Sequence, residues 1–204
     1  PGSTFKPVVA LAALKHGLIS SSEKIFCNGT YALGNRNFHC WKKGGHGNLN
    51  LIDGIAQSCD VYFYELALRL GIDKISEAAK KLGFGNYYDD FFGESKSIIP
   101  NKKWKKNKYA ESWQKGESLN VGIGQGFLLT TPLELAIMTA NIINKGAIIK
   151  PNILKSITNK KIEKQILENE DYFNNKHLEI IKKGMYKVLN SPKGTAWKSR
   201  VKDK

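Results

Sequence analysis

The sequence predicts a mixed fold of the α/β (α+β) class, on the basis of two patterns and the size of the chain. Apolar residues recur with helical spacing in several segments, as at Phe5, Val8, Val9 and Ala12. Short apolar runs separated by turn residues follow between residues 147 and 167. With 204 residues, 41% of them hydrophobic, the chain is long enough for one sizeable domain with a core of its own.

Helices dominate the first eighty residues. The predicted elements are helices over residues 3–16, 49–57, 60–71 and 72–83, with a glycine-rich loop over residues 20–48. Ser3 is a favourable N-cap residue for the first helix, and Gly17 would end that helix. Ser58 separates the second helix from the third and is also a favourable N-cap residue, while Gly83 would cap the end of the fourth. Both serines therefore have a purely structural explanation.

The second half combines a long connection with helices and strands. Residues 84–118 are polar, aromatic and basic, and connections of that length are usually functional or mobile. The run NKKWKKNKY within them is predicted to be a solvated loop that could face lipid headgroups or an anionic substrate. The elements predicted next are a glycine-rich turn, a helix capped by Thr130 or Thr131, strands over residues 147–151 and 153–167, and a helix over residues 174–190. No internal repeat and no domain boundary is predicted.

The formal charge of +14 indicates an anionic partner without identifying one. Nucleic acid, a membrane surface and a phosphorylated substrate would all suit a balance of 32 Lys+Arg against 18 Asp+Glu. The chain is also rich in Asn and Ile, which indicates a compositional drift toward AT-rich codons. No nucleic-acid recognition motif accompanies the basic runs. We therefore expect no nucleic-acid partner.

The beginning of the chain suggests a larger protein. The first residue is Pro1 rather than Met, and no signal peptide or anchor precedes it in the sequence. No stretch approaches the roughly 18 apolar residues of a helix that spans a bilayer. We expect the chain to start inside a longer protein, with any membrane anchor outside these residues.

The stretch PGSTFKP places Ser3 and Lys6 three positions apart, a spacing that puts both side chains on one face of a helix. A desolvated, neutral lysine could take the hydroxyl proton of the serine, which would then act as a nucleophile. The helix N-terminus would also favour negative charge that develops nearby. The Ser-x-x-Lys pattern is common by chance, so alone it is better explained by an N-cap serine and a solvated lysine.

A second polar corner, SCD, holds Ser58, Cys59 and Asp60 between two predicted helices. The hydroxyl of Ser58 could relay a proton, and Asp60 could fix either a lysine or a substrate amide. Taken singly, this corner is also explained by helix capping. The occurrence of both motifs in one chain, in this order, changes the balance in favour of catalysis.

Together the two motifs resemble those of the penicillin-binding transpeptidases, whose superfamily combines Ser-x-x-Lys, Ser-Asp-Asn and Lys-Thr-Gly. The resemblance extends along nearly the whole chain, in the segments PGSTFKP, WKKGGHGNLNL, SCDVYFYELA, VGIGQGFLLTTPLELA and GTAWKS. In these segments the chain looks like the monofunctional class B enzymes of cell elongation. The resemblance implies a penicillin-binding transpeptidase fold, similar to that of the serine β-lactamases, with helices packed on an antiparallel sheet.

The resemblance also implies roles for individual residues. Ser3 would be the nucleophile that accepts the acyl group, Lys6 its base, and Ser58 the proton shuttle. Asp60 stands where many relatives carry Asn, so its contact with a substrate amide would be altered. The residues expected to line the substrate groove are Gly124, Gln125 and Gly126. A plain turn at the entry of a helix is the alternative explanation for those three.

The third motif of the family, Lys-Thr-Gly, is absent from the chain. Residues 193–195 are KGT, which is the wrong order, and in the family the GTA stretch comes shortly before the strand that carries the motif. We therefore expect residues 1–204 to be a partial transpeptidase domain, truncated before that strand and lacking an N-terminal anchor and dimerisation region. Little or no acyl transfer is expected from these residues alone.

Three cysteines and a histidine form a candidate metal site. Cys27, Cys40, His46 and Cys59 are separated by 12, 5 and 12 residues, and His39 is a spare candidate. A set of three cysteines and one histidine suits structural zinc, which would tie the glycine-rich loop to the SCD corner. A Cys27–Cys40 disulfide, plausible in an oxidising compartment, is the second interpretation, and three buried thiols are the third. No cofactor is expected for catalysis itself.

The expected function is that of a peptidoglycan D,D-transpeptidase that crosslinks stem peptides through an acyl-enzyme on Ser3. β-Lactams would acylate the same serine. The resemblance implies a place at the periplasmic face of the bacterial inner membrane, with a membrane glycosyltransferase of the elongation machinery as partner. Two other classes remain open. One is a class D-like β-lactamase or a β-lactam sensor, which differs in its deacylation rate, and the other is a non-enzymatic basic binding domain.

Overall fold

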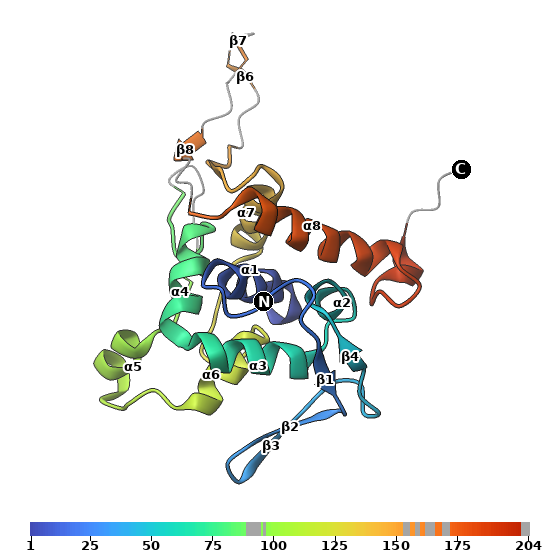
Figure 1. Ribbon diagram of the computed structural model, residues 1–204. Coiled ribbons are helices and arrows are strands. Elements are labelled where there is room, and N and C mark those ends of the chain that lie inside the picture. The colour runs from blue at the N-terminus through green and yellow to red at the C-terminus, as the bar shows by residue number, and fades with distance from the viewer. Residues whose placement is uncertain are drawn as a thin grey trace.

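The computed structural model describes residues 1–88, 95, 97–152, 156–157, 160–161, 166–168 and 172–200. Figure 1 shows helices gathered around one central helix, α1, with short strand pairs toward the periphery. The helices are α1 (Lys6–Lys15), α2 (Leu51–Ala56), α3 (Asp60–Leu70), α4 (Ile72–Lys81), α5 (Lys102–Tyr109), α6 (Lys115–Gly122), α7 (Pro132–Ile143) and α8 (Asn175–Asn190), with 3-10 turns η1 (Gly2–Phe5) and η2 (Trp197–Ser199). The strands are β1 (Ile25–Cys27), β2 (Thr30–Leu33), β3 (Arg36–His39), β4 (Gly47–Leu49), β5 (Ile148–Ile149), β6 (Ser156–Ile157), β7 (Lys160–Lys161) and β8 (Ile166–Glu168).

The central helix α1 is buried on every side. All of its residues from Lys6 to Leu14 are buried, and the helix packs against α3, α4 and α8. A helix that is apolar all round belongs in the core of a domain. Lys6 is the exception in this apolar sequence, so its ammonium group must find polar partners inside the protein.

The segment that the sequence predicted to be a loop, residues 20–48, contains three strands and the start of a fourth. β1 pairs with β4 and β2 pairs with β3, in both cases antiparallel. The prediction was wrong because each strand has only three or four residues, and the glycines between them hide the alternation of apolar and polar side chains. The register sets Cys27 opposite Gly47, which brings the end of β1 close to His46.

A second correction concerns residues 84–118, which contain α5 and the first half of α6. The basic run is a helix rather than a solvated loop, and Asn101 caps it by accepting a hydrogen bond from the Trp104 N–H at 2.7 Å. One of its lysines, Lys105, is buried in an ion pair with Glu117. The run has too little apolar periodicity for its helix to be recognised from the sequence.

The remaining predicted elements agree with the structure wherever it describes them. Thr131 is the N-cap of α7: its Oγ1 accepts from the Glu134 N–H at 3.2 Å, and its own N–H donates to Glu134 Oε2 at 2.9 Å. The helices predicted over residues 49–57, 60–71, 72–83 and 174–190 correspond to α2, α3, α4 and α8. The predicted strands correspond to β5 and to the β6–β7 pair, although part of residues 153–167 lies outside the described residues.

Helices and antiparallel strands thus occur together, as the predicted fold class requires. The described strands form four antiparallel pairs, β1–β4, β2–β3, β5–β8 and β6–β7. Within the described ranges, none of the helices has the length and hydrophobicity needed to cross a membrane.

Candidate active site

Ser3 lies in the short 3-10 turn η1, directly before α1. The sequence predicted Ser3 as an N-cap, but the residue before the turn is Pro1, and α1 itself begins after Phe5. The Ser3 hydroxyl makes no capping bond; it is exposed and accepts a hydrogen bond from the hydroxyl of Ser58 at 2.9 Å. The explanation of Ser3 as a helix cap is therefore wrong, and its Oγ stays available to a ligand.

Lys6 is buried, with only 1% of its surface exposed. Its Nζ donates to the Ser58 carbonyl at 2.8 Å, to Ser58 Oγ at 2.9 Å and to Asp60 Oδ1 at 2.7 Å. An ammonium group has three hydrogens, so these three acceptors satisfy it completely. Lys6 reaches Ser3 through Ser58, whose hydroxyl stands between the two.

Two opposing effects act on the charge of Lys6. Burial, the larger, lowers the pKa of its ammonium below the ordinary lysine value, and the adjacent Asp60 carboxylate opposes that shift. The net direction is downward, which favours the neutral amine. A lysine that can lose its proton is what a general base requires, and a solvated surface lysine would not offer it.

Ser58 occupies the corner between α2 and α3 in a left-handed backbone conformation, with φ of +51°. Few residues other than glycine adopt this conformation. The N-cap of α3 is Cys59 and not Ser58, so the capping explanation of this serine is wrong as well. The left-handed turn leaves the Ser58 hydroxyl between Lys6 and Ser3, where it bonds to both.

Both carboxylate oxygens of Asp60 are bonded within the protein. Oδ1 accepts from Lys6, and Oδ2 accepts from the main-chain N–H of Trp41 at 2.8 Å. Asp60 is 8% exposed. The sequence suggested that Asp60 binds either a lysine or a substrate amide. In the structure its carboxylate, in the first turn of α3, binds Lys6.

Trp41 is a residue of this corner that the sequence motifs did not identify. Besides its main-chain bond to Asp60, its indole N–H donates to the Ser58 carbonyl at 2.9 Å and to the Gln57 carbonyl at 3.2 Å. It lies 17 positions from Ser58 along the chain and follows β3. No local pattern indicated this contact, because it depends on how the β2–β3 hairpin is placed against α3.

A cleft of about 360 Å³ opens beside the three motif residues Ser3, Lys6 and Ser58. Its other side is largely apolar and comes from α7 and α8. The lining side chains there are Leu135, Met138, Met185 and Val188, with Thr195 close by. The cleft therefore combines the exposed hydroxyl of Ser3 with an apolar wall, as is common in binding sites for small organic groups.

The glycine-rich turn reaches the active site through the backbone. The Gly2 N–H donates to the Gly124 carbonyl at 3.0 Å, which fixes the residue next to Ser3. Gly124 has φ of +75°, and a Cβ atom there would overlap the Gly2 carbonyl oxygen. The side chain of Gln125 also lies near Gly2, whereas Gly126 packs near Asn120. The turn thus supports the position of Ser3, and its predicted role in binding substrate stays a prediction.

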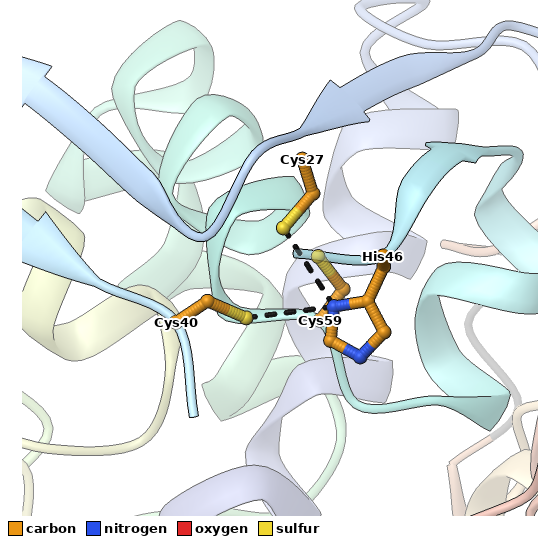
Figure 2. Close-up of side chains that lie close together, drawn as sticks. All are labelled: Cys27, Cys40, His46 and Cys59. Carbon is orange, nitrogen blue, oxygen red and sulfur yellow. Dashed lines mark hydrogen bonds between the residues drawn. The ribbon is translucent and has the colours of Figure 1, made fainter. Parts of the chain in front are cut away.

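The structure brings the four predicted metal ligands together (Figure 2). Their ligand atoms all lie within 4.8 Å of one another. His46 Nδ1 lies 3.5 Å from Cys40 Sγ and 3.6 Å from Cys27 Sγ. The fourth ligand, Cys59, comes from the N-cap of α3. His39, the spare candidate, faces Thr30 instead and is exposed.

The donor set fits a structural metal ion. All three cysteines are buried free thiols, and three sulfurs with one imidazole nitrogen are the donors that tetrahedral zinc takes. A hydrogen bond from Cys59 lowers the pKa of the Cys40 thiol, and the same bond raises the pKa of Cys59. The site therefore already favours one thiolate, the form that binds metal. His46 Nε2 is buried and has no hydrogen-bond partner among the described residues.

Comparison with protein families and known proteins agrees with this geometry. Residues 1–203 match the family described as the penicillin binding protein transpeptidase domain. The chain is 36% identical over 206 residues to the peptidoglycan D,D-transpeptidase MrdA of Haemophilus influenzae, covering 98% of this chain and 32% of that protein. The MrdA of Escherichia coli K12 is 35% identical over 205 residues, covering 97% of this chain and 32% of that protein. The chain thus spans about a third of the length of these relatives.

Solved structures show the same likeness. Pseudomonas aeruginosa PBP2, solved in complex with WCK 5153, superposes with a TM-score of 0.88 at 35% identity, covering 97% of this chain and 46% of that one. PBP2 from Helicobacter pylori superposes with a TM-score of 0.86 at 35% identity, covering 98% of this chain and 37% of that one. Another structure holds the Helicobacter pylori PBP2 together with MreC.

Proposed function

Because the chain belongs to the penicillin binding protein transpeptidase family, we propose that its protein is a PBP2-type peptidoglycan D,D-transpeptidase with Ser3 as the acylated nucleophile. The observation that carries this proposal is the hydrogen-bonded series from Lys6 through Ser58 to Ser3 at the edge of the cleft. The MrdA relatives, at 35% and 36% identity over nearly the whole chain, support the same reaction.

The reaction has two acyl-transfer steps. Ser3 Oγ attacks the carbonyl carbon of the penultimate D-Ala of a stem peptide, an ester bond forms, and the terminal D-Ala leaves as an amine that takes up a proton. The amine of a second stem peptide then attacks the ester, and Ser3 Oγ leaves with a proton restored to it. A β-lactam would form the same kind of ester, because its ring carbonyl is attacked in place of the peptide carbonyl.

The charge of Lys6 sets the direction of proton movement. As an ammonium, Lys6 donates to Ser58 Oγ, and the Ser58 hydroxyl then donates to Ser3. As a neutral amine, Lys6 has a lone pair for the Ser58 proton, so Ser58 can in turn accept the proton of Ser3. The neutral state therefore prepares Ser3 for attack, and the protonated state returns a proton to the leaving oxygen.

Labelling with fluorescent penicillin tests this proposal. A longer form of the protein that continues past Lys204 should carry a stable covalent label, and its Ser3→Ala variant should carry none. These 204 residues alone should label weakly or not at all, because the Lys-Thr-Gly motif is missing from them. Absence of label on a folded, extended wild-type protein would contradict the proposal. Rapid loss of the label would indicate a β-lactamase instead.

We also propose that Cys27, Cys40, His46 and Cys59 hold one structural zinc ion. The support is the convergence of their ligand atoms and the burial of the three thiols. The metal would join four separate points of the chain: the end of β1, the residue after β3, the residue before β4 and the N-cap of α3. A tetrahedral junction there would stabilise the short strands, which have little core of their own.

Metal analysis of the native protein should find about one zinc per chain, as expected of a four-ligand structural site. The His46→Ala variant should lose most of this zinc, while the His39→Ala variant keeps it and serves as the matched control. Wild-type protein without zinc, and with a mass two hydrogens below the reduced value, would instead support a Cys27–Cys40 disulfide. Equal zinc contents in the two histidine variants would contradict the assignment of His46 as a ligand.

The cellular setting follows from the proposed reaction. Stem peptides of peptidoglycan are extracytoplasmic, so we place the protein at the periplasmic face of the inner membrane during cell elongation. A membrane glycosyltransferase that supplies new glycan strands is the expected partner class. The similar PBP2 of Helicobacter pylori was solved in complex with MreC, which supports a protein partner for this chain without identifying the glycosyltransferase. No cofactor is needed for the acyl transfer itself.

A further inference from the structure

We propose that Trp41 is a positioning residue for acyl transfer, which holds Ser58 and Asp60 in place for Lys6 and Ser3. This inference rests on the proposed function and assigns a role to a residue outside the three sequence motifs. Trp41 contacts neither Ser3 nor Lys6 through any hydrogen bond that the structure gives it. It acts on them through the two residues that bond to Lys6.

Trp41 donates to the same groups that Lys6 uses. Its indole N–H and the Lys6 ammonium both reach the Ser58 carbonyl oxygen, at 2.9 and 2.8 Å. Its main-chain N–H and the Lys6 ammonium divide the two oxygens of Asp60, at 2.8 and 2.7 Å. A carbonyl oxygen has two lone pairs and a carboxylate has two oxygens, so these paired bonds are compatible. The Ser58 carbonyl and the Asp60 carboxylate therefore each accept a hydrogen bond from Trp41 as well as from Lys6. The Ser58 hydroxyl, the third acceptor of Lys6, receives no bond from Trp41.

The Ser58 hydroxyl depends on this support because of its backbone. A non-glycine residue with φ of +51° persists only where its surroundings fix that conformation. The main-chain bonds at this corner run back to α2, with the Ser58 N–H donating to the Ile55 carbonyl and the Cys59 N–H donating to the Gly54 carbonyl. The Ser58 carbonyl accepts from Lys6 and from Trp41, and of these two donors Lys6 is the one that changes charge in the proposed reaction. The indole N–H is therefore the donor that keeps the carbonyl fixed throughout.

Trp41 is well suited to this task because it is anchored itself. Its ring packs edge-to-face against His46 with the centroids 5.3 Å apart. The preceding residue, Cys40, belongs to the cluster of Figure 2, and its N–H donates to the Gly29 carbonyl at 2.9 Å. The indole thus extends from the end of β3 toward the corner between α2 and α3. The position of the β2–β3 hairpin therefore affects the position of the Ser58 hydroxyl.

The test is the Trp41→Phe variant in the extended protein that accepts penicillin. Phenylalanine keeps a ring for the His46 contact and the main-chain N–H for Asp60, but it removes the indole N–H. Time-resolved labelling at several penicillin concentrations separates the binding constant from the acylation rate constant. We expect the rate constant to fall about tenfold, as for the loss of one hydrogen bond that matters in the transition state. The binding constant and the zinc content should change by less than about twofold, since neither depends on this N–H.

The matched control is Trp113→Phe. The indole N–H of Trp113 also donates one hydrogen bond, to Ser118 Oγ at 2.8 Å, in a different part of the molecule. Both variants lose the same atoms, so a general effect of ring size would appear in both. An isostere of Trp41 with benzothiophene in place of indole keeps the ring volume and removes only the N–H donor. It should acylate as slowly as Trp41→Phe.

The outcomes are distinct. Failure of the wild-type protein to label would refute the proposed function itself. Normal labelling of the wild type with equal rate constants for Trp41→Phe and Trp113→Phe would refute only the role of Trp41. A slow rate that is accompanied by weaker penicillin binding or by loss of zinc would also refute the role of Trp41, because the effect would then be structural. An isostere that fails to fold, or that acylates at the wild-type rate, would also refute it.

Discussion

Replacing Lys6 with methionine is expected to slow the acylation of Ser3 by penicillin about 10²- to 10⁴-fold, the range typical of a positioned general base. Methionine has a similar length and suits a buried position, but it cannot accept the Ser58 proton. Without that acceptor the hydroxyl of Ser3 keeps its proton during attack. The measurement is the labelling rate in the extended protein, compared with the wild type at the same pH.

The same substitution should also destabilise the fold. Lys6 is the only ionic partner that the structure gives Asp60 among the described residues, and both side chains are nearly inaccessible, at 2% and 12%. Removing one member of a buried ion pair leaves the other charge uncompensated, with a cost of about 3–5 kcal/mol. The Trp41 N–H would still bond to Asp60, so we expect the lower part of this range. Chemical unfolding monitored by circular dichroism measures this loss.

A double variant separates the two effects. Lys6→Met combined with Asp60→Asn removes both charges, and the Asn side-chain oxygen can still accept from the Trp41 N–H. Most of the lost stability should therefore return, while acylation stays as slow as in Lys6→Met. Recovery of acylation together with stability would show that Lys6 acts only through folding, which would contradict its role as base.

Gly124→Ala is expected to slow the acylation of Ser3 about a hundredfold, since small displacements of reacting groups have effects of that size. An alanine Cβ at this position would overlap the Gly2 carbonyl, and the φ of +75° is already unfavourable for alanine. The backbone of Gly2 would have to move, and its bond to the Gly124 carbonyl would break. The readouts are the penicillin labelling rate of the extended protein and its melting temperature.

Gly17→Ala is the control for this prediction. Gly17 has φ of +64°, and a Cβ atom there would meet no atom within 4 Å. This variant therefore has a similar backbone strain, about 1–2 kcal/mol, without the overlap. It should lower the melting temperature and leave the labelling rate near that of the wild type. Equal labelling rates for the two variants would show that the Gly124 turn does not position Ser3.

The sequence predicted much of this site because its parts lie in short segments. The spacing of Ser3 and Lys6, the SCD corner and the four candidate metal ligands are all visible in the sequence, and the structure brings each group together. The long helices were also predictable, since their apolar residues repeat with the helical period. The cap of α7 at Thr131 follows from residue type alone.

Other features depend on tertiary structure and could not be predicted. The strands of residues 25–49 are too short to show alternation, so the segment looked like a loop. Ser58 and Ser3 both suited helix caps, and only the fold shows that neither residue acts as one. The contact of Trp41 with Ser58 needs the β2–β3 hairpin to lie against α3. No pattern in one segment encodes such a placement.

The hydrogen bonds of Lys6 also bear on how the protein folds. Those bonds join residues 52 and 54 positions apart in the sequence, and the Ser3–Ser58 bond spans 55 positions. Contacts between such distant residues require the closure of a long loop and do not form in an isolated helix. A refolding chain of the extended protein would gain the proposed penicillin reactivity only when α1 has docked against α3. The covalent label would then count native molecules during refolding, and its rate of appearance would report the assembly of the core.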